Sequence, residues 1–462
     1  MRANSGDSLL MHTDRPSKSA ASTTEEQVWI EKIRSFVILV FSLNVISAAM
    51  FIGLVNRPVY DDPFNIFDVH NYATRGLSVD TLLSQRNPPG PTSFLWMAAG
   101  VRLLRGGELR DARIAALASW MLLAAGILVA ARFSRFPRLW YGCLLSLLVF
   151  PHAIEAAATV LTEGPALLFA LFGVLAWTEF ASLPNVSAKH LGLGMLGGLS
   201  LGLAVTCRQY YLALLPASVF FAFYQRRTHS WKEKPLWVVS VVLSLALATV
   251  PVLLLVLIWK GISSPGMAAG TSYTNLRAAV GLNLSRPIVA AFYAAVYLVP
   301  LTFPAMIRMN GSRRRMAVLF AILGGAVVTI FGSLFLQPGP LNSLIRFASR
   351  LPHGGTTLFA VIAIVAIYNA ASVCALLWEQ RQMISSCAPA VFALLVILFF
   401  VAEQFGVGGN LPFYDRYVLQ LAPFLGLIAF TVLPRLTPAR VFALASLSAL
   451  SHIMLWRFGF NG

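Results

Sequence analysis

The stretch that decides the fold is SFVILVFSLNVISAAMFIGLV, residues 35–55, a run without a single charged side chain. A helix rises about 1.5 Å per residue, so about 20 residues cross the ~30 Å hydrocarbon core of a bilayer. The run therefore predicts a transmembrane helix. The preceding residues are polar, rich in Ser and Thr and mixed in charge, so we expect a retained anchor with residues 1–34 as a cytoplasmic tail.

Apolar runs of similar character continue to the end of the chain, which is 58% hydrophobic and only 11% charged. A water-soluble globule could not bury that much apolar surface, so we predict an all-α, polytopic membrane protein with about 11–13 spans. Residues 35–462 then form a single integral-membrane domain. After the first run, the others lie at 112–131, 139–153, 164–180, 191–206, 210–224, 236–258, 287–306, 316–336, 356–378, 388–402, 417–433 and 439–456.

The formal charge of +17 would suggest nucleic acid as a partner in a soluble protein. Here the basic residues instead follow the positive-inside rule, which places Arg and Lys in short cytoplasmic loops. With a cytoplasmic N-terminus, the inner loops include ARFSRFPR, QRRTHSWKEK, RMNGSRRR and PRLTPAR. We therefore predict membrane lipids as neighbours and no nucleic acid. The four cysteines lie in or beside apolar runs without CxxC spacing, which predicts neither disulfides nor a metal site.

The acidic residues have the opposite distribution. Beyond the N-terminal tail, ten of thirteen Asp and Glu fall on the outer face of this topology. Acidic residues contribute little to membrane orientation, so the bias indicates a functional surface on the extracytoplasmic side. The ten are Asp61, Asp62, Asp68, Asp80, Glu108, Asp111, Glu155, Glu163, Glu403 and Asp415.

The densest acidic motif is VYDDPFNIFDVHNYATRG, residues 59–76, directly after the first span. A carboxylate pair at a membrane surface can be partly desolvated, so Asp61 or Asp62 is a candidate general base. The alternative is an acidic turn that stays in water. Asp68 and His70 can bind a sugar hydroxyl or a divalent metal ion, or simply hydrogen-bond within the loop. No cofactor is firmly predicted from these residues, and the divalent metal ion stays an open alternative.

The first outer loop, residues 56–111, is long enough to contain helices of its own. NPPG at 87–90 stops one element, and TSFLWMAAGVRLL begins another that is too short to span comfortably. We expect an interfacial or re-entrant helix here.

A further carboxylate, Glu163, lies in a short turn between two apolar runs, LTEGP at 161–165. A charge left in hydrocarbon costs ~3 kcal/mol, so this side chain is expected to face a polar cavity. Alternatively, Glu163 reaches headgroup water and caps the following helix. We treat it as a second candidate catalytic acid.

Two clusters place arginine beside aromatic rings at outer helix ends. In the first, Arg208 precedes Gln209 and Tyr210. The planar guanidinium group matches phosphate oxygens, although an arginine at a helix end can also extend to lipid headgroups. The second cluster contributes candidate sugar- or phosphate-binding residues, with the alternative that its tyrosines are interface anchors: Asp415, Arg416 and Tyr417, with Arg346 from the preceding outer loop.

Several enzyme classes lack support in the sequence. It contains no Walker A motif, no Rossmann glycine fingerprint, no HExxH and no G-x-S-x-G. Nucleotide-driven pumps, dehydrogenases of the soluble type, zincins and serine hydrolases are therefore not predicted.

The order of these motifs resembles the GT-C superfamily of integral-membrane glycosyltransferases. The shared pattern is an acidic motif after the first span, a Pro-Pro-Gly helix, an acid in a later outer turn, and Arg-Gln at a helix start. LTEGPALLFALFGVLAW and GLAVTCRQYYLALLP resemble segments of the dolichyl-phosphate-glucose α-1,2-glucosyltransferases. Bacterial lipid A, arabinose and mannose transferases share the generic pattern. The resemblance implies that Asp61 or Asp62 is the catalytic acid and Glu163 the second acidic position.

The resemblance also implies a reaction, namely sugar transfer from a polyprenyl-phosphate or dolichyl-phosphate carrier to a glycan, lipid or protein acceptor. Attack on an anomeric carbon needs a carboxylate to take the proton, while Arg208, Arg346 or Arg416 would stabilise the phosphate that leaves. We therefore expect an inverting glycosyltransferase with an extracytoplasmic site, in a bacterial plasma membrane or the endoplasmic reticulum. The alternative is a lipid or glycolipid transporter or flippase.

Overall fold

A computed structural model describes residues 20–59, 61–87, 90–181, 183, 188–225, 235–261, 264–266, 282–309, 311–336, 340–406 and 415–461. Over these residues the chain forms helices and no strand, in agreement with the predicted all-α class.

Eight helices among the described residues are long and apolar enough to cross a membrane, which makes the protein a polytopic membrane protein. Each contains an uninterrupted stretch of at least 18 residues with few charges, as a spanning helix requires. They belong to α1 (Ala20–Leu54), α5 (Glu108–Phe133), α8 (Glu163–Ala181), α9 (Ala188–Cys207), α11 (Pro235–Trp259), α13 (Ser285–Thr302), α18 (Gly354–Glu379) and α22 (Pro438–Asn461).

The remaining apolar runs form helices that are too short or, in α15 (Gly311–Ile330), carry three arginines near the start, which is why fewer spans are found than apolar runs. The run at 139–153 contributes only a 12-residue helix, because the chain turns after Leu148. The shorter helices are α6 (Pro137–Leu148), α7 (Ala153–Ala158), η1 (Gln209–Ala213), α10 (Leu214–Gln225), α14 (Pro304–Arg308), α16 (Gly332–Phe335), α17 (Pro340–Ala348), α19 (Arg381–Ser385), α20 (Ala388–Glu403), η3 (Asp415–Gln420) and α21 (Ala422–Val432).

The first outer loop contains three helices, α2 (Asp62–Arg75), α3 (Val79–Ser84) and α4 (Pro91–Leu104). The predicted helix after NPPG is confirmed as α4, since Pro91 fits the first turn, where its missing N–H costs nothing. At the other end of the first span, α1 begins at Ala20, so part of the expected polar tail is helical.

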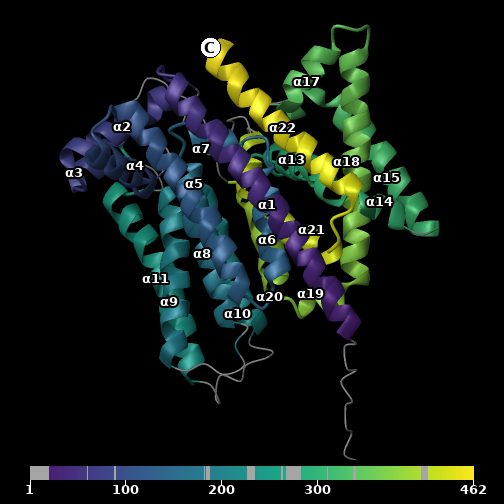
Figure 1. Cartoon of the computed structure of the whole chain (residues 1–462), viewed down its shortest axis with the longest axis horizontal. Helices are drawn as coiled ribbons and strands as arrows, with labels where there is room; N and C mark the ends of the chain where they lie inside the picture. The colour runs from purple at the N-terminus through teal and green to yellow at the C-terminus, as the bar shows by residue number, and fades with distance from the viewer. Residues whose placement is uncertain are drawn as a thin grey trace, which may run out of the picture.

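Helix direction divides the bundle into two ends (Figure 1). The N-terminal end of α1 and the short helix α19 lie at the lower end, while α2, α7 and the C-terminal end of α22 lie at the upper end. The acidic starts of α2, α5 and α8 therefore meet at the upper end, at the place where α1 finishes.

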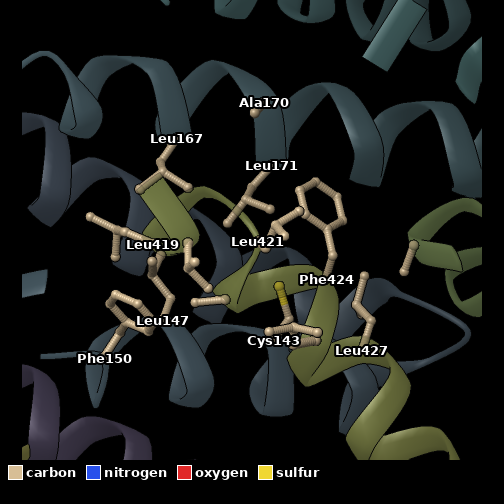
Figure 2. Close-up of a cluster of buried hydrophobic side chains, with 14 of the residues drawn as sticks. Cys143, Leu147, Phe150, Leu167, Ala170, Leu171, Leu419, Leu421, Phe424 and Leu427 are labelled. Carbon is tan, nitrogen blue, oxygen red and sulfur yellow. The ribbon is translucent and has the colours of Figure 1, made fainter. Parts of the chain in front are cut away.

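The core lies where two short helices, α6 and α21, pack along each other. Both are buried on all sides, which explains why their sequences are apolar all round. Gly426 allows this close contact because it has no side chain; a Cβ atom added there would lie 1.9 Å from the Ser146 Oγ. Figure 2 shows the result, a cluster in which Cys143, Leu147 and Phe150 meet side chains of α8, η3 and α21. The core therefore fixes η3, which carries three candidate site residues, beside α8.

Candidate active site

Asp61 occupies the N-cap position of α2, at the upper end of the bundle. Its Oδ2 atom lies 2.7 Å from Nη2 of Arg416 in η3. The Asp61 side chain is 37% exposed and that of Arg416 19% exposed. The two motifs that flank the long middle of the chain are thus in direct contact, and one carboxylate at this contact is accessible.

Asp62, the neighbouring residue, has a different environment. Its side chain is fully buried and forms an ion pair with Arg113 of α5, with 2.5 Å between Oδ2 and Nη2. Its carboxylate also accepts hydrogen bonds from the backbone N–H groups of Val59 and Val160. Arg113 in turn donates to the carbonyl of Val55. Through these contacts Asp62 joins the end of α1, α2, α5 and the turn before α8.

Glu163 and Arg208 form a second ion pair, with 3.1 Å between Oε1 and Nη2. Glu163 is the first residue of α8 and is 1% exposed, so it does not reach bulk solvent. Arg208 also donates from Nη1 to the Thr162 hydroxyl at 2.7 Å. Among the residues that the structure describes, neither carboxylate oxygen of Glu163 has a hydrogen-bond partner of suitable geometry. Glu163 is therefore a buried acid that can accept further hydrogen bonds, and it lies beside the buried Arg208.

Two tyrosines bring these ion pairs together. The rings of Tyr210 and Tyr417 lie 4.6 Å apart between centroids. The guanidinium carbon of Arg208 lies 5.6 Å from the Tyr417 centroid, and that of Arg416 lies 5.8 Å from the same centroid. Both guanidinium groups thus stand against one aromatic ring. The predicted clusters at 208–210 and 415–417 form one site.

The electrostatic balance at Arg416 shows which acids share the site. Burial alone would lower the pKa of Arg416, but the carboxylates of Asp61, Glu163 and Glu155, together with Tyr417, raise it well above its usual range. Arg416 therefore stays charged among several carboxylates. Because Glu155 affects Arg416, it belongs to the surroundings of the site.

Sequence reasoning missed several of these surroundings. Glu155 was recognised only as an outer acid, and its carboxylate lies 2.7 Å from Nδ1 of His152, both in the interior. Arg286, at the start of α13, is 3% exposed and donates to the Gln404 amide oxygen at 3.2 Å. An arginine at a helix start resembles an ordinary interface anchor in sequence, so no local signal distinguishes Arg286.

Other predicted residues lie apart from this site. Asp68 is buried and accepts hydrogen bonds from the backbone N–H groups of Arg86 and Asn87 and from the Asn87 amide. Burial raises the pKa of Asp68, and these hydrogen bonds oppose the shift. His70 pairs with Glu108 at 2.8 Å on the exposed side of α2. Both residues have local partners that fix the first outer loop.

The remaining predicted residues also have defined places. Gln209 is the first residue of η1, while Arg346 lies in α17, which Figure 1 shows at the upper right, away from α2 and α7. Asp415 begins η3, and its side chain lies outside the described residues. In the part of the chain that the structure describes, no group of three or more His, Cys, Asp or Glu side chains could hold a metal ion.

Helix α4 contacts Thr162 and Cys207, the neighbours of Glu163 and Arg208, and holds them in place. Its N-cap Gly90 donates its backbone N–H to the Cys207 carbonyl at 3.0 Å, and the Ser93 hydroxyl contacts both Thr162 and Cys207. A Cβ at Gly90 would lie 1.9 Å from the Thr206 carbonyl oxygen, so only glycine permits this approach. Gly90 and Ser93 thereby position the residues next to Arg208.

The sequence matches no protein-family profile and no curated protein. Solved structures do align with it. ArnT from Cupriavidus metallidurans in the apo state aligns with a TM-score of 0.37 and 14% identity, over 94% of this chain and 78% of that one. The same protein bound to undecaprenyl phosphate gives 0.38 and 15%, over 90% and 77%. The Archaeoglobus fulgidus oligosaccharyltransferase tethered with an acceptor peptide gives 0.32 and 12%, over 89% and 55%.

Proposed function

We propose that the protein is an inverting glycosyltransferase that moves a sugar from a polyprenyl-phosphate carrier to a hydroxyl-bearing glycan, lipid or protein acceptor. The observation that carries the proposal is the contact between Asp61, an accessible carboxylate, and Arg416, at a site that also contains Arg208 and Glu163. A base and two permanent positive charges are the groups that such a transfer requires.

In the proposed reaction, an acceptor hydroxyl attacks the anomeric carbon and Asp61 takes its proton. A new glycosidic C–O bond forms as the C–O bond to the carrier phosphate breaks, and polyprenyl phosphate leaves with the electron pair. Arg208 and Arg416 stand against the same Tyr417 ring and would stabilise the charge on the leaving phosphate. No general acid is needed, because a phosphate leaves as an anion.

The geometry favours Asp61 over Asp62 as the base. A general base must reach the proton that it abstracts, and Asp61 is part-exposed, whereas Asp62 is enclosed by Arg113 and two backbone N–H groups. Glu163 is proposed as the second acid, which holds Arg208 and adds negative charge near an oxocarbenium-like transition state.

The proposal is tested by transfer of radiolabelled sugar from polyprenyl-phosphate donors to extracted acceptors in vesicles containing the protein. Arg208→Ala should lower kcat/KM by about a hundredfold, as the loss of one charge-stabilising donor does. Arg208→Lys should restore only part of the activity, because an ammonium group lacks the planar fork. The matched control is Arg313→Ala, which removes an exposed arginine from a pair with Glu379 and should leave transfer unchanged. Movement of the intact glycolipid across the bilayer without sugar transfer would support a flippase instead.

The site is also proposed to face away from the cytoplasm, with the N-terminus inside. Leu77 between α2 and α3 is 63% exposed, and Met383 in α19 at the other end of the bundle is 45% exposed. In a Cys374→Ser background, Leu77→Cys should react with an impermeant maleimide in intact cells or sealed microsomes of lumen-out orientation. Met383→Cys should react only from the cytoplasmic side. The reverse pattern would invert the orientation.

A further inference from the structure

We propose that Arg416 is a positioning residue that holds Asp61 in an ion pair until the phosphate group of the donor binds Arg416 and releases the carboxylate. The inference rests on the proposed function and adds an order of events: donor first, acceptor second. It begins from a conflict within the site, because a base engaged by a guanidinium group is not free to accept a proton.

The two arginines of the site differ in how firmly they are held. Arg208 is 10% exposed, and its ion-pair partner Glu163 is 2% exposed. Arg416 is 19% exposed, and its ion-pair partner Asp61 is 37% exposed, so this pair is the more open of the two. Ion pairs exposed to solvent contribute little free energy and can exchange partners, whereas a buried pair resists separation. Arg416 is therefore the guanidinium group that an incoming anion can recruit.

The surroundings keep Arg416 charged through this exchange. Glu163 and Glu155 favour its protonated form, as does Tyr417. When Arg416 turns from Asp61 to a phosphate oxygen, it therefore remains a cation with a new anionic partner. The Tyr417 ring, against which both guanidinium groups lie, provides a fixed surface for this movement. A phosphate between Arg208 and Arg416 would be held by two planar forks.

The exchange makes the base available only when the donor is present. An acceptor that arrives first meets a carboxylate still engaged by Arg416, so its proton is not taken. Water is subject to the same restriction, because hydrolysis also needs the carboxylate to be free. The ion pair thus orders the binding steps without a moving lid.

The test measures modification of Asp61 by dicyclohexylcarbodiimide, a membrane-soluble reagent that attacks accessible carboxyl groups and spares ion-paired ones. The protein is reconstituted in phosphatidylcholine vesicles, with or without sugar-free undecaprenyl phosphate, and the modified peptide is quantified by mass spectrometry. Undecaprenyl phosphate should raise the labelling of Asp61 about threefold, because the loss of an exposed ion pair changes an equilibrium by only about that factor. Labelling of the exposed Asp80 should not change.

Variants and ligand controls separate the remaining outcomes. Arg416→Gln should show the high labelling without any phosphate, and Arg416→Lys an intermediate level that still rises on addition. Inorganic phosphate or phosphatidylglycerol should have little effect; an equal rise with either would overturn a role for the carrier phosphate. Unchanged or lower Asp61 labelling with undecaprenyl phosphate, in protein active in sugar transfer, overturns the inference alone. A rise in labelling in protein without transfer activity overturns the proposed function and supports the phosphate exchange.

Discussion

Asp61→Asn should lower kcat for sugar transfer by about a thousandfold, while leaving the protein folded and inserted. Removal of a general base costs on the order of 10²–10⁴ in rate. The amide keeps the size of the side chain and can still contact Arg416, so the packing of η3 against α2 should persist. The measurement is initial rate under saturating donor and acceptor, with thermal unfolding followed in parallel.

The matched comparison is Glu163→Gln, which changes a carboxylate at the same site without removing the proposed base. Its kcat should fall less than that of Asp61→Asn, because the acid acts through Arg208. Retention of full transfer in Asp61→Asn would remove this residue as the base. A larger loss in Glu163→Gln than in Asp61→Asn would exchange the roles of the two acids.

Arg113→Ala should destabilise the protein by about 3–5 kcal/mol, the cost of leaving one member of a buried ion pair without its partner. The Asp62 carboxylate would stay buried, and the carbonyl of Val55 would lose its donor. We expect a large fall in the midpoint of thermal unfolding in detergent and little folded protein in the membrane. Loss of transfer activity would follow from loss of structure.

A matched ion pair shows whether burial is the cause. Arg34 and Glu31 lie three residues apart in α1 with exposed side chains, so Arg34→Ala should cost at most about 1 kcal/mol. A similar thermal shift in Arg34→Ala and Arg113→Ala would contradict a special role for the buried pair. So would an Arg113→Ala protein that unfolds at the temperature of the wild type.

Sequence patterns predicted the parts of the structure that depend on local composition. Residues 35–54 of the uncharged run lie in α1, and the helix predicted after NPPG is α4. The distribution of charges along the sequence also predicted that the acids of α2, α5 and α8 lie on the same face of the membrane. These features arise from hydrophobicity and turn chemistry within a few residues, so one sequence is enough to find them.

The choice between Asp61 and Asp62 required tertiary structure. The two acids are adjacent in sequence, and the difference comes from Arg113, which lies 51 residues beyond Asp62 along the chain. In sequence, Arg113 begins an apolar run and resembles a residue that reaches toward headgroups. Its burial depends on α5 packing against the end of α1. The same reasoning applies to Arg286, whose partner Gln404 lies 118 residues further along the chain, and to the influence of Glu155 on Arg416.

The pairing of Asp61 with Arg416 has a consequence for how the protein is made. One partner is inserted with the first span, and the other emerges only after most of the remaining helices. At synthesis rates of about 5–20 residues per second, tens of seconds separate the two. During that interval Asp61 stands at the membrane surface of a growing chain that lacks Arg416. The proposed sugar transfer would therefore become available late in biogenesis, and a chain terminated before η3 should insert most of its helices but lack activity.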